Sequence, residues 1–334
     1  MAVATHDPDV HSEAAEPPPR RRPLLIILGV LGALGTLLLG FVGTLPEHHP
    51  PEVGRLVFGN VPGWLQAVFY VTTASFIALA AVLFAQRSRV WMPGAPDDRT
   101  RMWRQRITQL GRGLTMQTLM RDRQAGLMHT MVYLGFLVLF AGTVTLEIDH
   151  ILPNQFKFLE GNVYLGYSAI LDLASLVYLG GLAWAFTRRY LQRPWRLRSK
   201  TKPEDAVILT LLALIGITGL TTEAARIALD GRPDFEVWSF VGYPLSFLVP
   251  DSVAASAHLT SWLIHFAAFL SFLVVLPTTK LRHMVTSPAN MFLSPHDRPK
   301  GAMREMPNLA EVEDIETIGA SIVSDFTWKQ LFDT

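Results

Sequence analysis

The stretch that decides the fold is WLIHFAAFLSFLVVLPTTKLRH, residues 262–283. It is apolar enough for a lipid bilayer, yet it carries His265 and His283, which are 18 residues apart. Eighteen steps of ~100° complete five helical turns, so both imidazoles leave a helix on the same face, ~27 Å apart along its axis. The hydrocarbon core of a bilayer is ~30 Å thick. One helix is therefore predicted to offer a metal-binding side chain near each membrane surface.

A second apolar segment repeats this arrangement. His129 and His150 are 21 residues apart, which is ~31 Å along a helix with an angular drift of ~60°. Antiparallel packing of the two helices would pair His129 with His283 near one surface. It would pair His150 with His265 near the other. Because facing histidines in a helical bundle are suited to hold heme iron, the pattern predicts two b-type hemes, one at each level.

The composition is typical of a membrane protein. Of 334 residues, 50% are hydrophobic and 17% are charged, and the mean hydropathy is +0.28; these values are too apolar for an ordinary soluble domain. The chain has no cysteine. This excludes disulfides, thiolate-bound iron–sulfur clusters and covalently attached heme within it, and leaves histidine as the natural metal ligand. The net charge of +1 gives no sign of nucleic-acid binding.

Six apolar runs are long enough to cross a bilayer. They cover residues 23–43, 64–85, 126–147, 164–187, 206–228 and 256–280. Nine arginines lie between the second and third runs, whereas the opposite-side connections hold only Arg55, Lys157 and Arg232. By the positive-inside rule, this asymmetry places both termini in the cytoplasm. The predicted fold class is all-α, a polytopic bundle of six transmembrane helices.

Three parts follow from these runs. Residues 1–22 are predicted to be a disordered cytoplasmic N-terminus, residues 23–283 a six-helix membrane cytochrome b domain, and residues 284–334 a cytoplasmic tail. The tail has too few apolar residues to form a domain alone. The basic connection 86–125 is predicted to be either an amphipathic segment lying on the membrane surface or a solvated loop that only sets topology.

Two histidines compete for the outer position opposite His265. His150 follows the polar sequence EID, which is already interfacial, whereas His258 lies one heptad before His265 on the same helix face. His258 could be the outer ligand, a group that supports it, or part of a quinone pocket. Both candidates stay open beside His129, His265 and His283. The remaining histidines lie in polar segments and are expected to be solvated.

Ionisable side chains within the predicted spans are functional candidates. Glu223 could deliver protons to a quinone, or could be neutralised by Arg226 three residues later on one helix face. Asp172 could take part in proton transfer or bind a hydroxyl of a neighbouring helix. Glu147 and Asp149, beside His150, could orient a ligand imidazole or take up protons, but solvation at the surface is the expected role. Four basic residues near the cytoplasmic histidines could pair with heme propionates: Arg121, Arg123, Lys280 and Arg282.

Several segments resemble the cytochrome b family that includes the gamma subunit of respiratory nitrate reductase. The stretch 262–292 is similar to the last membrane helix of that family, which also carries two heme-ligating histidines eighteen residues apart. The resemblance is closer to the membrane domain of heterodisulfide-reductase-like proteins, which serve bacteria as electron-transfer-flavoprotein:menaquinone oxidoreductases. Supporting matches are GLMHTMVYLGFLVLFAGT (126–143), LEGNVYLGYSAILDL (159–173) and TGLTTEAARIAL (218–229).

This resemblance implies heme ligation by His129, His265 and His283. It does not supply the outer fourth ligand, because the nitrate reductase relatives space their first histidine pair more closely than 21 residues. In the relatives, a cytoplasmic domain with ferredoxin-like clusters and CCG motifs follows the membrane domain, and DFTWKQLFDT (325–334) resembles the lead-in to it. The tail 284–334 is therefore expected to lead to, or to dock, an iron–sulfur domain or subunit.

The expected function is that of a di-heme b membrane subunit of a quinone-linked oxidoreductase in the bacterial cytoplasmic membrane. It would pass electrons between a cytoplasmic electron transfer flavoprotein with iron–sulfur centres and menaquinone, in contact with membrane lipids. Two alternatives stay open. One is a heme-free membrane anchor of a cytoplasmic enzyme, and the other is a proton-coupled transporter that uses Asp172, Glu223 and the histidines as a relay.

Overall fold

The computed structural model describes residues 22–44, 51–99, 101–117, 119–294 and 322–333. Six of its helices are long and apolar enough to cross a membrane, which confirms the six predicted runs. These helices are α1 (Arg22–Gly43), α2 (Gly63–Arg87), α4 (Arg123–Ile151), α5 (Gly161–Phe186), α7 (Pro203–Leu229) and α9 (Ala254–Thr278).

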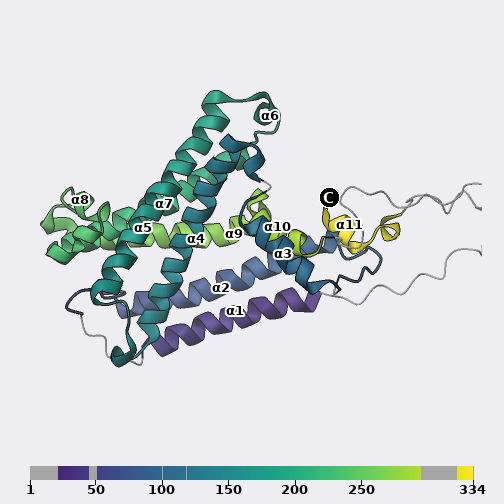
Figure 1. Cartoon of the computed structure of the whole chain (residues 1–334). Coiled ribbons are helices and arrows are strands. Elements are labelled where there is room, and N and C mark those ends of the chain that lie inside the picture. The colour runs from purple at the N-terminus through teal and green to yellow at the C-terminus, as the bar shows by residue number, and fades with distance from the viewer. Residues whose placement is uncertain (1–21, 45–50, 100, 118, 295–321, 334) are drawn as a thin grey trace, which may run out of the picture.

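The shorter elements lie at the two ends of these six helices (Figure 1). They include α3 (Trp103–Leu114), α6 (Trp195–Arg198), α8 (Gly242–Ser246), α10 (His283–Phe292) and α11 (Trp328–Asp333), and a π-helical turn, Thr187–Gln192, that continues α5. We call the end with α3 and α10 the inner end of the bundle and the end with α8 the outer end. These names describe the molecule and imply no side of a membrane.

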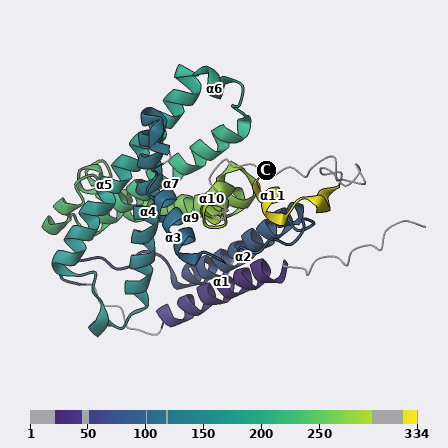
Figure 2. The same ribbon diagram turned by 45° about the vertical axis from the view of Figure 1, so that its right-hand side comes forward.

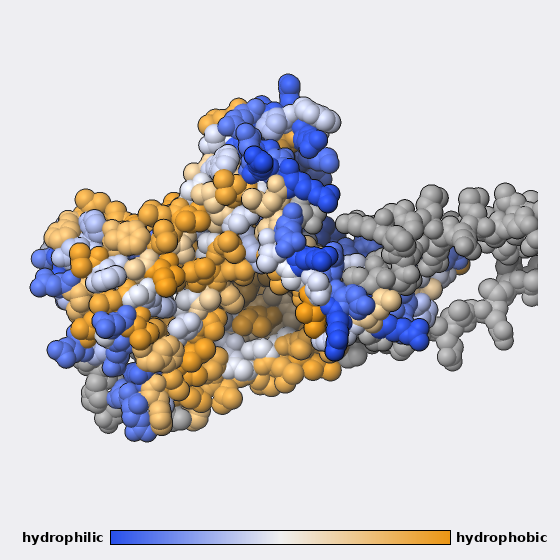
Figure 3. All heavy atoms as spheres, in the orientation of Figure 1, coloured by the Kyte–Doolittle hydropathy of each residue, from blue (hydrophilic) through white to orange (hydrophobic). Residues whose placement is uncertain are grey.

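The long helices expose apolar side chains to their surroundings. In α1, for example, Leu31 and Phe41 are 59% and 63% exposed, and Figure 3 shows hydrophobic residues over the middle of the bundle with hydrophilic ones gathered toward its ends. Contiguous apolar surface on this scale is unfavourable in water and is expected of helices that face lipid.

The helices pack in a chain of neighbours, α1 on α2, α2 on α9, α9 on α7, and α5 on both α7 and α4. Figures 1 and 2 show α4 and α5 crossing the α1–α2 pair at a steep angle. A buried cluster centred on Tyr178, Leu212 and Phe272 joins α5, α7 and α9. Small residues bring α4 against α5, because Gly135 lies on the backbone of Tyr178 and Gly181 lies on that of Val132.

The last long helix ends before it reaches His283. Residues 262–283 were expected to form one uninterrupted helix, but α9 ends at Thr278, Thr279 is extended, and His283 is the first residue of α10. Pro277, which has no N–H to donate within a helix, lies in the last turn of α9 next to this break. The Thr279 hydroxyl then accepts the Leu281 N–H at 3.2 Å, which caps a short 3₁₀ turn. The helical phase that relates His265 to His283 is therefore lost.

The inner end is tied together by contacts distant in sequence. The buried Arg106 of α3 donates to the carbonyl oxygens of Phe292 and Ser294, at 2.9 and 3.2 Å, at the end of α10. The segment 322–333 returns to the same place, where Thr327 pairs with Ala95 in a parallel bridge and the Lys329 ammonium donates to Asn290 of α10 at 2.9 Å. These contacts join the end of α10 to α3 and to the segment 322–333.

Candidate functional site: a histidine pair beside a basic pocket

His129 and His283 meet at the inner end. His129 lies near the start of α4 and His283 begins α10, and their ring centroids are 6.2 Å apart with the ring planes 58° from parallel. The spacing of the histidines predicted this pair, and the two rings come together although α9 does not reach His283. The break at Thr279 carries His283 back toward α4.

The hydrogen bonds of this pair suit metal ligation. The Nδ1 atom of His283 is 2.7 Å from the Lys280 carbonyl oxygen. A carbonyl only accepts, so Nδ1 carries the proton and Nε2 keeps its lone pair; metal-ligating histidines typically show this second hydrogen bond. Nδ1 of His129 is buried and has no hydrogen-bond partner among the described residues. Each ring therefore has a nitrogen atom without a hydrogen-bond partner among the described residues, Nε2 in His283 and Nδ1 in His129.

The distance between the rings fits one metal atom. Metal–imidazole bonds of about 2 Å on each side, with about 1 Å from each nitrogen to its ring centre, add up to about 6 Å. Among the described residues there is no cluster of three or more His, Cys, Asp or Glu side chains that could hold a metal ion alone. A heme iron needs only two protein ligands, because the porphyrin supplies the other four nitrogens. The residues present therefore fit a heme better than a bare ion.

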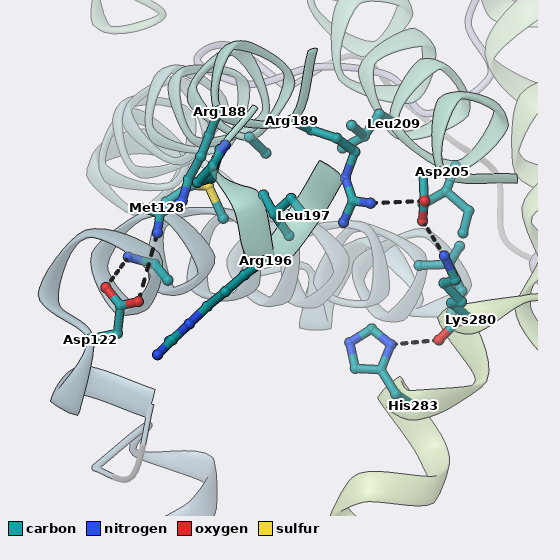
Figure 4. A pocket seen from close by; sticks show the side chains of 15 residues that line it. Asp122, Met128, Arg188, Arg189, Arg196, Leu197, Asp205, Leu209, Lys280 and His283 are labelled. Atoms are coloured by element: carbon teal, nitrogen blue, oxygen red, sulfur yellow. Dashed lines mark hydrogen bonds and ion pairs between the residues drawn. The ribbon is translucent and has the colours of Figure 1, made fainter. Parts of the chain in front are cut away.

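A pocket of about 370 Å³ opens beside His283, between the start of α4, the end of α5, α6 and the start of α7 (Figure 4). Its lining is apolar at Met128, Leu209 and Leu281 and strongly basic elsewhere. The basic side chains are Arg188, Arg189, Arg196 and Lys280, and the acidic ones are Asp122 and Asp205. Such a pocket accepts a ligand that is apolar in part and negatively charged in part.

The sequence did not identify most of these basic residues. Of the four proposed propionate partners, Lys280 lines the pocket, whereas Arg121, Arg123 and Arg282 are not among its lining residues. The arginines after α5 were not among the propionate partners predicted from the sequence. The fold brings them to the pocket because the π-helical turn after α5 and the short α6 turn the chain back across His283.

Near the middle of α9, in its outer half, His265 faces α7. Its Nδ1 atom is 3.0 Å from the Thr218 hydroxyl oxygen. That hydroxyl donates its proton to the Leu214 carbonyl at 2.6 Å, so its oxygen must accept from the imidazole. Nδ1 of His265 therefore carries the proton, and Nε2 keeps a free lone pair as in His283.

The two candidates for the fourth ligand have different surroundings. Nδ1 of His258 is 3.4 Å from the amide nitrogen of Asn60, a donor, so Nδ1 accepts and Nε2 carries the proton. His150 is buried, packs edge-on against Phe58 with centroids 5.3 Å apart, and lies beside Gly43 of α1. His150 and His265 thus face different helices, and the choice of fourth ligand stays open.

The acidic candidates surround the start of α8. The fully buried Asp172 accepts the backbone N–H groups of Val241 and Gly242 through Oδ2, at 2.6 and 3.2 Å, in place of the expected hydroxyl partner. Its Oδ1 is buried without a hydrogen-bond partner among the described residues. The Glu223 carboxyl group also lies against Gly242, where a Cβ atom would be 2.9 Å from it. Two carboxyl groups therefore converge on one backbone turn.

Arg226 forms ion pairs with acids outside its own helix. Its guanidinium lies 2.7 Å from Glu236 Oε1 and 3.2 Å from Asp230 Oδ2, and it also donates to the Tyr164 hydroxyl. Glu223 forms no direct ion pair among the described residues, and the choice between neutralisation by Arg226 and proton delivery stays open. Although burial raises the pKa of Glu236, its hydrogen bonds from Arg226 and the charge of that guanidinium outweigh burial and hold the pKa below its usual value.

Asp149 is also not solvated as expected. Its side chain is buried, and Oδ1 accepts the N–H groups of Phe158 and Leu159 at 2.8 and 2.9 Å. Glu147 accepts a hydrogen bond from the Tyr70 hydroxyl at 2.8 Å. Both carboxylates hold parts of the fold in place: Asp149 fixes the connection after α4, and Glu147 joins α4 to α2.

Comparison with known proteins places this arrangement in a family. Residues 100–298, which include His129, His265 and His283, match the nitrate reductase gamma subunit family. The chain belongs to that family. The region that matches the family, residues 100–298, begins before α3 and covers four of the six long helices, α4, α5, α7 and α9.

Two curated relatives of this gamma-type chain are redox proteins. It is 30% identical over 308 residues to the EtfAB:quinone oxidoreductase of Syntrophomonas wolfei subsp. wolfei (strain DSM 2245B / Goettingen), a match that covers 85% of this chain and 41% of the relative. It is 26% identical over 271 residues to the probable iron-sulfur-binding oxidoreductase FadF of Bacillus subtilis (strain 168), covering 80% and 37%. The chain thus spans about two fifths of the length of these relatives. No solved structure gives a significant match.

Proposed function

We propose that this chain is the heme-bearing membrane part of a quinone-linked oxidoreductase. The observation that carries the proposal is the His129–His283 ring pair, 6.2 Å apart, in a member of the nitrate reductase gamma subunit family. The overall reaction would move electrons between a cytoplasmic electron transfer flavoprotein, with its iron–sulfur domain or subunit, and menaquinone. The names of the two relatives support an iron–sulfur and flavoprotein partner and a quinone substrate.

In this proposal the inner end holds one heme b between His129 and His283. When bound, the heme supplies one-electron oxidation and reduction of its iron. The Lys280 carbonyl keeps the proton of His283 on Nδ1, which fixes the ring orientation. A second heme b is proposed at His265, with Thr218 in the corresponding role and His150 or His258 as fourth ligand.

Menaquinone reduction also consumes two protons, and we propose that Glu223 and Asp172 supply them from the outer end. The two carboxyl groups lie against the same backbone turn at Gly242, close enough to act together. Intramembrane carboxyl groups with these surroundings are suited to proton transfer. Their part would be to hold and release a proton at the carboxyl oxygen.

The proposed orientation follows from the basic residues of the inner end. Both termini and the inner end would face the cytoplasm of a bacterium, and the six helices would cross its cytoplasmic membrane. The membrane domain would comprise residues 23–283. The tail would dock an iron–sulfur partner, and the contacts of segment 322–333 with α10 and with the 88–97 connection support this, because they bring the chain back to the His283 side.

An optical experiment tests the proposal. The full chain is purified in detergent, inserted in lipid vesicles, and mixed with a reduced menaquinone analogue under anaerobic conditions. The expected result is a b-type alpha band that appears on mixing and is diminished in the variants His129→Ala and His283→Ala. A heme-free preparation would support a membrane anchor or a transporter instead, and a heme that no quinol reduces would contradict the quinone substrate.

A further inference from the structure

The basic pocket beside His283 has an unbalanced charge. Four cationic side chains line it, Arg188, Arg189, Arg196 and Lys280, but only two anionic ones, Asp122 and Asp205. An excess of two positive charges at the end of a membrane bundle requires a counter-anion or water to remain favourable.

The ion pairs show where the excess lies. The Asp205 carboxylate is held between Arg189 and Lys280, at 2.8 and 2.7 Å. Arg188 is 3.7 Å from Asp122, a carboxylate that is 51% exposed. For Arg196 no ion pair is found within the described part of the chain, and Figure 4 shows its extended side chain between Asp122 and His283. Arg196 and the loosely paired Arg188 are therefore the cations left for a ligand.

The position of the pocket connects it with the histidine pair. His283 belongs to its lining, and so does Met128, which directly precedes His129 in α4. A flat group held between the two imidazoles would thus have the pocket along one of its edges. Heme b carries two propionates on one edge, so their charge would balance the excess of two positive charges in the pocket lining.

We propose that this pocket binds the two propionate carboxylates of the heme held by His129 and His283, with Arg196 and Arg188 as their partners. The inference rests on the proposed function, because it presupposes a heme at that pair. Arginine suits the task, since its planar guanidinium can bind a carboxylate through two parallel hydrogen bonds and stays charged at any physiological pH. The apolar side chains of the pocket would strengthen these contacts by excluding water.

The experiment uses two test variants, the single variant Arg196→Gln and the double variant Arg188→Gln/Arg196→Gln. The matched control is Arg198→Gln. Like Arg196, Arg198 is exposed and lies in the short helix α6, but it does not line the pocket. Two readouts are taken on the full chain in lipid nanodiscs: the midpoint potential of the heme that disappears in His283→Ala, and the rate at which that heme transfers to a soluble heme acceptor.

Arg196→Gln is expected to lower the midpoint potential, because loss of a nearby positive charge favours the more positive ferric state. It is also expected to speed heme transfer about tenfold, the factor for one charge-assisted hydrogen bond. Arg196→Lys keeps the positive charge but lacks the planar guanidinium. It should therefore retain the midpoint potential of the wild type and release heme at an intermediate rate. Arg198→Gln should match the wild type in both readouts.

Equal potentials and equal transfer rates in Arg196→Gln and Arg198→Gln would overturn the inference while leaving the proposed function intact. A second contrary outcome concerns lipid, since basic pockets between membrane helices also bind anionic headgroups. If Arg196→Gln differs from the wild type only in nanodiscs that contain phosphatidylglycerol, the pocket binds lipid and not propionate. Absence of heme from the wild type would instead contradict the proposed function itself.

Discussion

The inner and outer ends of the bundle carry similar histidines in different surroundings. At the inner end His129 and His283 face each other across 6.2 Å, beside a pocket with four cationic side chains. At the outer end His265 bonds to Thr218 of α7, His258 lies near Asn60, and His150 packs on Phe58. The outer end has a buried network of acids and one arginine in place of a basic pocket. We infer that the inner end already presents a pair of heme ligands that face each other. Binding of a heme at the outer end would require the helices to rearrange.

Replacing the ligands should have the largest effect. His283→Ala is expected to remove the whole of one heme per chain, because the ring supplies one of only two protein ligands to that iron. His265→Ala is expected to remove the other heme, and the double variant both. The heme content is measured as the pyridine hemochrome relative to protein. Unchanged heme in both single variants would refute the assignment at both ends.

The outer network should contribute strongly to stability. Glu236 is fully buried and accepts hydrogen bonds from Arg226, Tyr164 and Ser239. Glu236→Gln removes the charge and leaves the buried Arg226 undercompensated, so we expect a loss of about 3 kcal/mol in the free energy of unfolding in detergent. Asp230→Asn is the control: its side chain is 45% exposed, and the loss should stay below about 1 kcal/mol. Similar losses in both variants would contradict this account of the outer end.

The same carboxylate should make stability depend on pH. The pKa of Glu236 is lower in the folded protein than its usual value, so the stabilisation is fully present above the unfolded pKa of about 4.3 and is lost as the pH falls through the folded pKa. Burial raises the pKa of Asp230, which adds an opposing dependence. The test is therefore the difference in melting temperature between wild type and Glu236→Gln, which should shrink as the pH falls from 6 toward 3. A constant difference would contradict it.

A smaller effect is expected at Thr218. Thr218→Val keeps the shape of the side chain but removes the acceptor of the His265 proton, a neutral hydrogen bond worth about 1 kcal/mol. The outer heme should then dissociate about fivefold faster, and the inner heme at its normal rate. Thr222→Val is the control, because that hydroxyl bonds only the Thr218 carbonyl within the described part of α7. Equal dissociation of both hemes in Thr218→Val would show that the hydroxyl does not orient His265.

The orientation of the two ends can be tested with almost no change to the protein. Because the chain has no cysteine, single variants such as Gln105→Cys in α3 and Asp234→Cys near α8 can be labelled specifically. In intact cells an impermeant maleimide should label Asp234→Cys and should reach Gln105→Cys only after the membrane is opened. The reverse labelling pattern would place the inner end on the outer side of the membrane and would contradict the proposed orientation.

The comparison also shows what a sequence of this kind can predict. The six spans follow from hydropathy, and the approach of His129 and His283 follows from matched depths on two apolar segments. The break at Thr279 was missed, although Pro277 is a visible signal for it. The pocket arginines and the Arg226–Glu236 pair could not be predicted, because these contacts depend on how connections such as 187–202 and 230–253 fold back onto the bundle. Side chains that meet through a tertiary turn leave no periodic pattern in the sequence.

The central claim is that iron is held between His129 and His283, and the electron paramagnetic resonance spectrum of the oxidised full chain tests it most directly. The account predicts two low-spin ferric signals of bis-imidazole type, one from each heme. One of them should be lost in both His129→Ala and His283→Ala and retained in His258→Ala. Absence of any heme signal, or survival of both signals in His129→Ala and His283→Ala, would contradict it.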